Sequence, residues 1–223
     1  MDNITKVFQE IYINIKELNP IDRPCIIGVN GIDTSGKTEF AKKFKQYLEE
    51  KEHNVQIVHI DDFHNPKKVR YSGENQVGNY FNKSFDIKNL VENILVPIKE
   101  EGFLHTKLKL LDLGTDEYNI QKEFYIEKNT IVILEGVFIF REEIYPYLDY
   151  KIFIDIPLNE CKRRAIERDV PLYGDEILEK YDTKYIPTQK YYFKKYPIKK
   201  YADVIIDNTN WDKPKIVSDL KEQ

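Results

Sequence analysis

Residues 31–38 read Gly-Ile-Asp-Thr-Ser-Gly-Lys-Thr, and no other segment says more about the architecture of this chain. The spacing GxxxxGK followed by Ser or Thr lets unhindered backbone N–H groups converge on the β-phosphate of a nucleoside triphosphate. Lys37 then reaches the β- and γ-phosphate oxygens, and the hydroxyl of Thr38 can ligate Mg²⁺. The residues predicted to bind ATP or GTP are Gly31, Asp33, Thr34, Ser35, Gly36, Lys37 and Thr38.

The residues around this phosphate-binding loop separate it from a chance match. Cys25 to Asn30 form a short apolar run of the buried-strand type. Downstream, apolar residues recur at helical spacing through Glu50, namely Phe40, Ala41, Phe44 and Leu48. Strand, glycine loop and helix in this order form the context that such a loop requires, and an ordinary glycine turn is the alternative reading.

Length and composition place the chain among soluble globular proteins. Its 223 residues fit one α/β domain with an insertion, here residues 1–223, better than two full domains. Thirty-four basic and 38 acidic side chains give a formal net charge of −4, which argues against nucleic-acid binding. We recognise no secretory leader and no apolar run of membrane-spanning length, so we expect a cytoplasmic protein without membrane contact. The oligomeric state stays open, a homo-oligomer included.

The two cysteines indicate a reducing compartment. Cys25 falls on a predicted buried strand and Cys161 on a predicted helix, far apart in sequence and without metal-ligand spacing. Both are interpreted as reduced, structural thiols.

Apolar patterning predicts a mostly parallel α/β sheet. An amphipathic stripe from Ile4 to Leu18 predicts an N-terminal helix that ends before Pro20. Helical patterns separate most of the five predicted strands, as in sheets with helices on both faces. These strands are Cys25 to Asn30, Val55 to Ile60, Thr130 to Leu134, Lys151 to Ile156, and Asp203 to Ile206.

One interval departs from this rhythm. From Leu104 to Leu110 apolar and polar residues alternate, and after Gly114 the alternation resumes at Tyr118, Ile120, Phe124 and Ile126. This pattern predicts a two-stranded ribbon, residues 103–127, inserted into the α/β sheet.

Asp61 and Asp62 end the second predicted strand. In an open α/β sheet this position places them at the same edge as the glycine loop. A carboxylate there can orient or deprotonate an acceptor hydroxyl, or help to hold the metal. We predict that Asp61 is the acceptor-side base, with a helix cap as the alternative. The shares of Asp62 and His64 in that role stay open.

Glu135 ends the apolar strand that begins at Thr130. A carboxylate in this position is expected to help position Mg²⁺ opposite Thr38, directly or through water. The metal ligands predicted from the sequence are therefore Thr38, Glu135 and Asp61, and a surface Glu at a turn is the alternative for Glu135.

Arg164 and Arg168 lie four residues apart on a predicted helix and share one face. Two neighbouring guanidinium groups suit a triphosphate whose charge shifts in the transition state. Together with Lys37 and Asp61 they complete the predicted catalytic set. A solvated helix face with ion pairs is the alternative.

The segment between Asp182 and Asp203 holds six lysines, five tyrosines and no acid. Basic residues interleaved with aromatics can stack single-stranded nucleic acid, so a polynucleotide acceptor is one hypothesis. A helix packed on the sheet with its lysines outside explains the same pattern and agrees with the acidic net charge.

With these residues in place, the chain resembles the uridine kinase family of P-loop kinases, the group that includes phosphoribulokinase. The resemblance runs from about Pro24 to Asn208. Its landmarks are the phosphate-binding loop, Asp61-Asp62-Phe63-His64, Ser84-Phe85-Asp86 before a helix that ends near Pro97, Glu135-Gly136-Val137-Phe138, Arg164 with Arg168-Asp169, and Tyr201 to Ile206.

The resemblance implies a Mg²⁺-dependent transfer of the γ-phosphoryl group of ATP or GTP to a hydroxyl of a small molecule, often a nucleoside. It also implies a P-loop NTPase fold with a five-stranded parallel sheet, a β-hairpin over the acceptor and a helical arginine lid near residues 159–185. Asp61 matches the family's catalytic aspartate, and Arg164 and Arg168 match its lid arginines. A regulatory NTPase or switch without a small-molecule acceptor is the alternative function.

The acceptor pocket departs from the family pattern. Uridine kinases carry an Asp-His-Pro-Asp segment that holds the ribose hydroxyls, where this chain reads Tyr80-Phe81-Asn82-Lys83. They also carry a tyrosine and a histidine on the hairpin, where this chain has Leu111 to Asp116, including Asp112. The sequence therefore predicts family membership without naming the acceptor.

Overall fold

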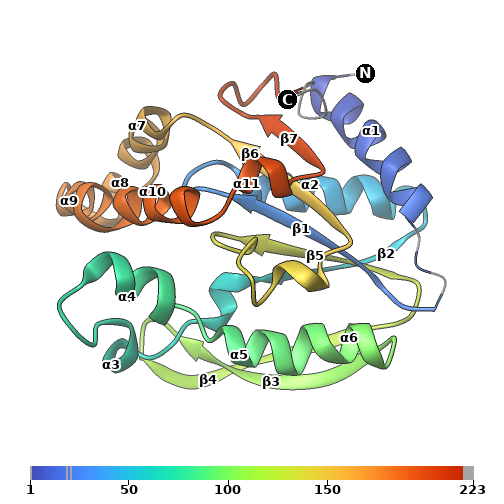
Figure 1. Ribbon diagram of the computed structural model, residues 1–223, viewed down its shortest axis with the longest axis horizontal. Coiled ribbons are helices and arrows are strands. Elements are labelled where there is room, and N and C mark those ends of the chain that lie inside the picture. Colours follow the sequence, from blue (N-terminus) through green and yellow to red (C-terminus); the bar gives the residue numbers. More distant parts are fainter. Residues whose placement is uncertain (1, 19, 21, 218–223) are drawn as a thin grey trace.

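A six-stranded sheet forms the centre of the protein in the computed structural model, which describes residues 2–18, 20 and 22–217 (Figure 1). Five strands are parallel, and the short β8 pairs antiparallel with β7 at one edge. In spatial order the strands are β2 (Asn54–His59), β5 (Thr130–Gly136), β1 (Cys25–Gly31), β6 (Tyr150–Asp155), β7 (Val204–Asp207) and β8 (Lys215–Ile216). The predicted fold class is confirmed.

The sequence prediction omitted β8, because a strand of two residues carries no recognisable periodicity. The ends of the predicted domain, residue 1 and residues 218–223, lie outside the described residues.

The two central strands, β1 and β5, are buried along their whole length. Their alternate residues feed two separate apolar cores, so that Ile26 contributes to one face of the sheet and Ile27 to the other. A strand buried on both faces is expected to read as a continuous apolar run, which is the pattern that identified these segments.

Helices cover both faces of the sheet (Figure 1). On one face lie α1 (Asn3–Leu18) and α2 (Lys37–Glu49), joined by the ring of Phe8, whose centroid lies 5.2 Å from Phe40 and 5.1 Å from Phe44. The other face carries a helical run made of α5 (Ile87–Leu90), the π-helical turn η2 (Val91–Leu95) and α6 (Val96–Glu100). The predicted end near Pro97 is three residues early.

The π-helical turn explains why the run continues through Pro97. Proline has no N–H to donate and its ring crowds the preceding turn. In η2 the N–H of Val96 bonds to the carbonyl of Val91, five residues back, so the α-helical pattern is already interrupted where Pro97 enters.

The inserted ribbon consists of β3 (Leu104–Asp112) and β4 (Glu117–Ile126), which form a sheet of their own. The predicted alternation is correct for Leu104 and Leu110 on β3 and for Phe124 and Ile126 at the base of β4, all of which are buried. At the tip it is wrong for Tyr118 and Ile120, which are 44% and 46% exposed. The register shifts between Leu110 and Leu111, and such a bulge changes which side chains face the core.

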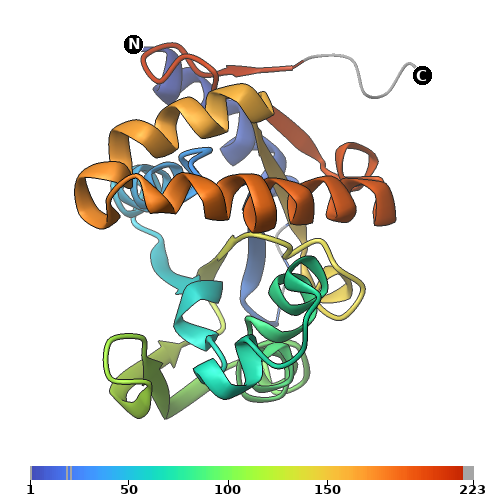
Figure 2. The same cartoon turned by 90° about the vertical axis from the view of Figure 1, so that its left-hand side faces the viewer.

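The chain after β6 forms a series of short helices that lie across from the ribbon (Figure 2). They are α7 (Leu158–Arg168), α8 (Val170–Tyr173), α9 (Glu176–Lys180), the π-helical turn η4 (Tyr181–Tyr185), α10 (Ile186–Lys195) and α11 (Ile198–Tyr201). The remaining helices are η1 (Ile60–Phe63), α3 (Lys67–Arg70), α4 (Gln76–Lys83) and η3 (Tyr145–Tyr147). Within the described part of the chain, no helix has both the length and the apolar character needed to cross a membrane.

Helix α10 is anchored to the sheet by Tyr192. Its buried hydroxyl accepts hydrogen bonds from the Phe140 N–H at 2.9 Å and from Asn30 Nδ2 at 3.0 Å. Tyr192 and Tyr196 are buried while Lys190, Lys194 and Lys195 are exposed, as expected for a helix packed on the sheet with lysines outside.

Replacing Tyr192 by Phe should destabilise the protein. The variant leaves the buried Phe140 N–H without its acceptor, a loss of about 1–3 kcal/mol in the free energy of unfolding. Urea unfolding measures this loss, and Tyr191→Phe, at a position 42% exposed on the same helix, is the control expected to change nothing. Equal midpoints for both variants would contradict the anchoring role.

Candidate active site

The phosphate-binding loop lies at the carboxyl end of β1 and leads directly into α2. Gly36 takes a left-handed conformation with φ of 88°, and a Cβ there would lie 2.6 Å from the Trp211 ring. Thr34 is also left-handed, with φ of 58°. These turns bring the loop to the start of α2, where the first N–H groups of a helix have no intrahelical partners and attract anions. The loop therefore fits a polyphosphate.

Glu135 lies directly behind this helix start. Its Oε1 accepts the Thr38 hydroxyl at 3.1 Å and His59 Nδ1 at 2.5 Å. The side chain is 3% exposed, and its Oε2 has no hydrogen-bond partner among the described residues. Burial acts to raise the pKa of Glu135, but the His59 hydrogen bond and the charge of Lys37 outweigh it and the net pKa is lowered.

An ionised carboxylate with one unused oxygen, next to the Thr38 hydroxyl, suits Mg²⁺. In the described residues no group of three or more His, Cys, Asp or Glu side chains could hold a metal by itself. The fit is therefore to an ion that also takes phosphate oxygens as ligands.

Asp61 and His64 line a cavity of about 480 Å³ on the other side of the loop. The Asp61 side chain is exposed in this cavity, and desolvation by the neighbouring protein raises its pKa while the positive charge of Lys37 opposes the shift. His64 Nδ1 donates to the Asp61 carbonyl at 2.6 Å. Asp62 is different, because its carboxylate pairs with Lys122 of the ribbon.

A second cavity, of about 490 Å³, lies in front of the start of α2. Lys37, Thr38, Trp211 and Arg168 line it. Arg168 also lines the cavity of Asp61. Its guanidinium pairs with Asp169 at 2.6 Å and the side chain is 59% exposed, so it stands between the two cavities with donors to spare.

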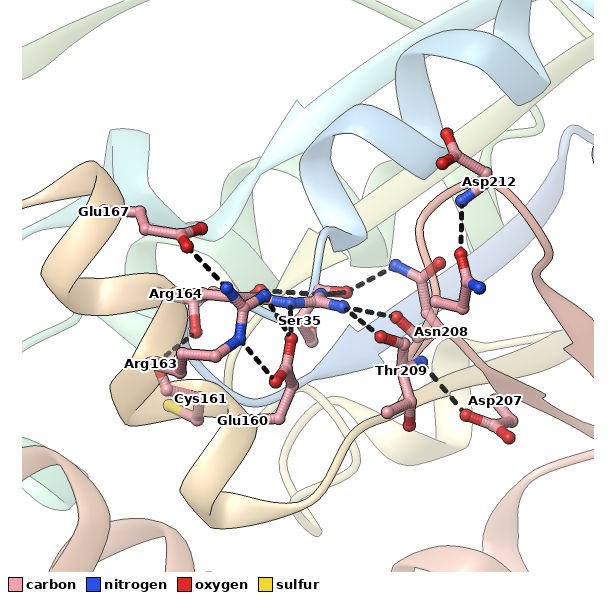
Figure 3. Close-up of polar contacts among 12 residues, drawn as sticks. Ser35, Glu160, Cys161, Arg163, Arg164, Glu167, Asp207, Asn208, Thr209 and Asp212 are labelled. Carbon is pink, nitrogen blue, oxygen red and sulfur yellow. Dashed lines mark hydrogen bonds and ion pairs between the residues drawn. The ribbon is translucent and has the colours of Figure 1, made fainter.

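Arg164 lines the second cavity together with Arg168, as expected for two arginines on one helix face, but its side chain is enclosed. Its side chain is 3% exposed and its guanidinium is bound on all sides (Figure 3). It donates to Glu160 at 2.8 Å, to the Asn208 carbonyl at 2.6 Å and to the Thr34 carbonyl at 3.3 Å. Its outer face lies 3.9 Å from the Trp211 ring centroid. Arg164 therefore lines the cavity while its donors are used by Glu160 and by carbonyl groups, including that of Thr34 in the loop.

Asp33, predicted to bind the nucleotide, and Asp112, noted in the hairpin, each make a hydrogen bond within the protein. Asp33 accepts a hydrogen bond from Gln189 at 3.2 Å and lines the cavity of Asp61. The Asp112 carboxylate accepts from the Gly114 N–H at 2.7 Å, so it stabilises the turn of the ribbon. The two cysteines are free and buried, and burial raises the pKa of Cys25 to about 12 and that of Cys161 to about 11.

Sequence reasoning missed His59 and Trp211 as residues of this site. His59 carried a usable signal, because parallel strands that end at the same edge place it opposite Glu135, the register that β2 and β5 adopt. Trp211 lies in a loop beyond the last predicted strand, and nothing in the local pattern places it against Gly36.

Comparison with known proteins gives a consistent result. The family model described as "Phosphoribulokinase / Uridine kinase family" matches residues 26–213. A uridine kinase from Limosilactobacillus reuteri is 28% identical over 196 residues, which cover 82% of this chain and 83% of that protein.

Two solved structures share the fold. One is described as "a Possible Uridine Kinase from Bacillus stearothermophilus", with a TM-score of 0.69, 22% identity, and coverage of 90% of this chain and 98% of that one. The other is D-glycerate 3-kinase from Cryptococcus neoformans, with a TM-score of 0.65, 12% identity, and coverage of 84% and 87%. At these identities the structures support the fold alone.

The two arginines should respond differently to the same substitution. Arg164→Gln removes buried hydrogen bonds to the Thr34 and Asn208 carbonyls, while Glu160 keeps its pair with Arg163, so we expect a loss of about 1–3 kcal/mol in unfolding free energy. Arg168→Gln, at a position 59% exposed, leaves Asp169 with its Tyr181 hydrogen bond, so the loss of stability should be smaller. Thermal and urea unfolding measure both variants, and a fully stable Arg164→Gln protein would contradict the supporting role.

Proposed function

Because the chain belongs to the phosphoribulokinase/uridine kinase family, we propose that it transfers the γ-phosphoryl group of ATP to a hydroxyl of a small metabolite, a nucleoside or a related compound. The observation that carries the proposal is the meeting of two cavities at the phosphate-binding loop. One lies in front of Lys37 and Thr38, and the other contains Asp61. Because Arg168 lines both cavities, a donor in one and an acceptor in the other can lie next to each other.

The donor side follows from the geometry of the loop. The first N–H groups of α2 and the ammonium of Lys37 would bind the β- and γ-phosphates of ATP or GTP. Thr38, with Glu135 directly or through water, would hold Mg²⁺, which when bound neutralises phosphate charge. His59 keeps Glu135 ionised and oriented, so its contribution is to position the carboxylate.

The acceptor side is organised by Asp61. In its ionised form this carboxylate would accept or orient the proton of the attacking hydroxyl. Arg168, which borders both cavities, is the arginine placed to stabilise the transferring group as charge shifts. We infer that the helices of residues 159–185 act as a lid that excludes water, with Arg164 as a positioning residue at its base.

A regulatory NTPase without a small acceptor is the competing function. A switch hydrolyses its nucleotide with water and signals to a macromolecule, so it has no need of a second cavity beside a carboxylate. The 480 Å³ cavity that contains Asp61 favours the kinase.

A coupled ADP-release assay against nucleosides, vitamins and sugars tests the proposal. We expect acceptor-dependent ADP release with MgATP, and we expect Lys37→Ala to abolish it while the protein stays folded by circular dichroism. ADP release that no metabolite stimulates but a protein partner does would support the switch. Near-normal turnover by Lys37→Ala would contradict the assignment of the loop.

The pH dependence of kcat/KM tests the base. Asp61 must be ionised to act, and its surroundings raise its pKa. Activity should therefore fall, as the pH is lowered, through a pKa above the ordinary aspartate value of about 3.9. Asp61→Asn should lower kcat by about 10²- to 10⁴-fold and remove this acid limb.

His64→Gln is the matched control for that experiment, because His64 lines the same cavity and lies three residues away. It should keep the acid limb that Asp61 produces. If Asp61→Asn kept both normal activity and the acid limb, Asp61 would not be the base.

A further inference from the structure

One wall of the Asp61 cavity carries a group of cations that the proposed reaction does not use. Arg70, Lys180 and Lys184 line this wall. Arg70 comes from α3, whereas Lys180 and Lys184 come from α9 and the adjoining η4, more than 100 residues later in the sequence. The fold therefore brings the three positive charges together at the place where an acceptor would bind.

The ammonium of Lys184 lies inside a cage of three tyrosine rings. Its Nζ is 5.2 Å from the centroid of Tyr71, 4.8 Å from Tyr80 and 5.3 Å from Tyr185, and all three rings line the cavity. No ion pair joins Lys184 to a carboxylate among the described residues. Burial lowers its pKa, and the nearby charges of Arg70 and Lys180 lower it further.

Arg70 also has unused binding capacity. Its side chain is 13% exposed, and its only carboxylate neighbour within the described ranges is Asp116, at 3.6 Å. That carboxylate already accepts the Lys67 N–H with both oxygens, at 2.9 and 3.1 Å. The Nε of Arg70 is buried and has no hydrogen-bond partner in the part of the chain that the structure describes.

The acidic side chains that line the cavity form no ion pair with Arg70 or Lys184. Asp169 is bound by Arg168 and by the Tyr181 hydroxyl, at 2.6 Å each. Asp61 is needed at the reacting hydroxyl, and Asp33 accepts from Gln189. Cations that are shielded from water and lack partners are costly unless an anion joins them.

We propose that the acceptor carries an anionic group, a carboxylate or a phosphate ester, which Arg70 and Lys184 bind while the acceptor hydroxyl lies at Asp61. This inference rests on the proposed kinase function and narrows its substrate class. A planar guanidinium and a caged ammonium together suit either anion. A neutral nucleoside would leave Lys184 without an anionic partner and Arg70 with only the 3.6 Å pair to Asp116, so the preferred acceptor is not uridine.

The first test compares acceptors that differ only in the anionic group. The matched pairs are glycerate with glycerol and ribose 5-phosphate with ribose, and uridine is the neutral nucleoside. We expect kcat/KM for a charged member to exceed that of its neutral partner, and the preferred pair distinguishes carboxylate from phosphate. Lys184→Met and Arg70→Met should each reduce this preference by about 10- to 100-fold, the loss of one charge-assisted hydrogen bond.

Lys190→Met is the control variant, since Lys190 is an exposed lysine on α10. It should keep the full preference. Equal use of charged and neutral acceptors, or a preference that survives in Lys184→Met and Arg70→Met, would overturn the anion site and leave the kinase function intact.

The second test measures anion binding without turnover. With a nonhydrolysable ATP analogue and Mg²⁺ saturating the loop, acetate and inorganic phosphate are titrated against the midpoint of thermal unfolding. At least one should raise the midpoint of the wild type and of Lys190→Met, but not of Lys184→Met or Arg70→Met. Identical responses in all four proteins would overturn the proposal. Anion binding at Lys184 without ADP release from any acceptor would contradict the kinase function instead.

Discussion

The backbone of the phosphate-binding loop can present its N–H groups to a ligand only if its carbonyl groups find donors on the opposite side. Arg164 supplies two of these donors, to Thr34 and Ser35, at 3.3 and 3.5 Å. Asn208 supplies another to the Ser35 carbonyl at 2.7 Å, and the Cys161 thiol bonds to the Asp33 carbonyl at 3.1 Å. Helix α7 and the loop after β7 thus fix the conformation of the phosphate-binding loop before a ligand binds.

Burial and neighbouring charges set the protonation of the two carboxyl groups beside the phosphate-binding loop. Glu135 is kept ionised by His59 and the charge of Lys37, whereas the surroundings of Asp61 raise its pKa. Glu135, with the lower pKa, suits a metal ligand that stays ionised. Asp61, with the raised pKa, suits a group that accepts a proton from a hydroxyl. Arg70 and Lys184 line the same cavity as Asp61 and add a third, positive region, in which Lys184 forms no ion pair with a described residue.

The sheet, α2 and the base of the ribbon were predictable because each is encoded by local periodicity or spacing. The positions of Lys37, Thr38 and Asp61 followed from the rule that parallel strands present functional residues at their carboxyl ends. The different roles of Arg164 and Arg168 were not predictable, because helical spacing puts both on one face and only tertiary contacts show which one is enclosed. The environment of Lys184 was equally hidden, since two of its three tyrosine neighbours, Tyr71 and Tyr80, lie more than 100 residues away in the sequence.

The central claim is that a nucleoside triphosphate binds in the cavity at the start of α2. The fluorescence of Trp211 measures this binding directly. Trp211 is the single tryptophan of the chain, and it lines the cavity with Lys37. Titration of the wild type with MgATP should change its emission in a saturable manner, and Lys37→Ala should require far more MgATP for the same change. Emission that stays constant up to millimolar MgATP would contradict the account.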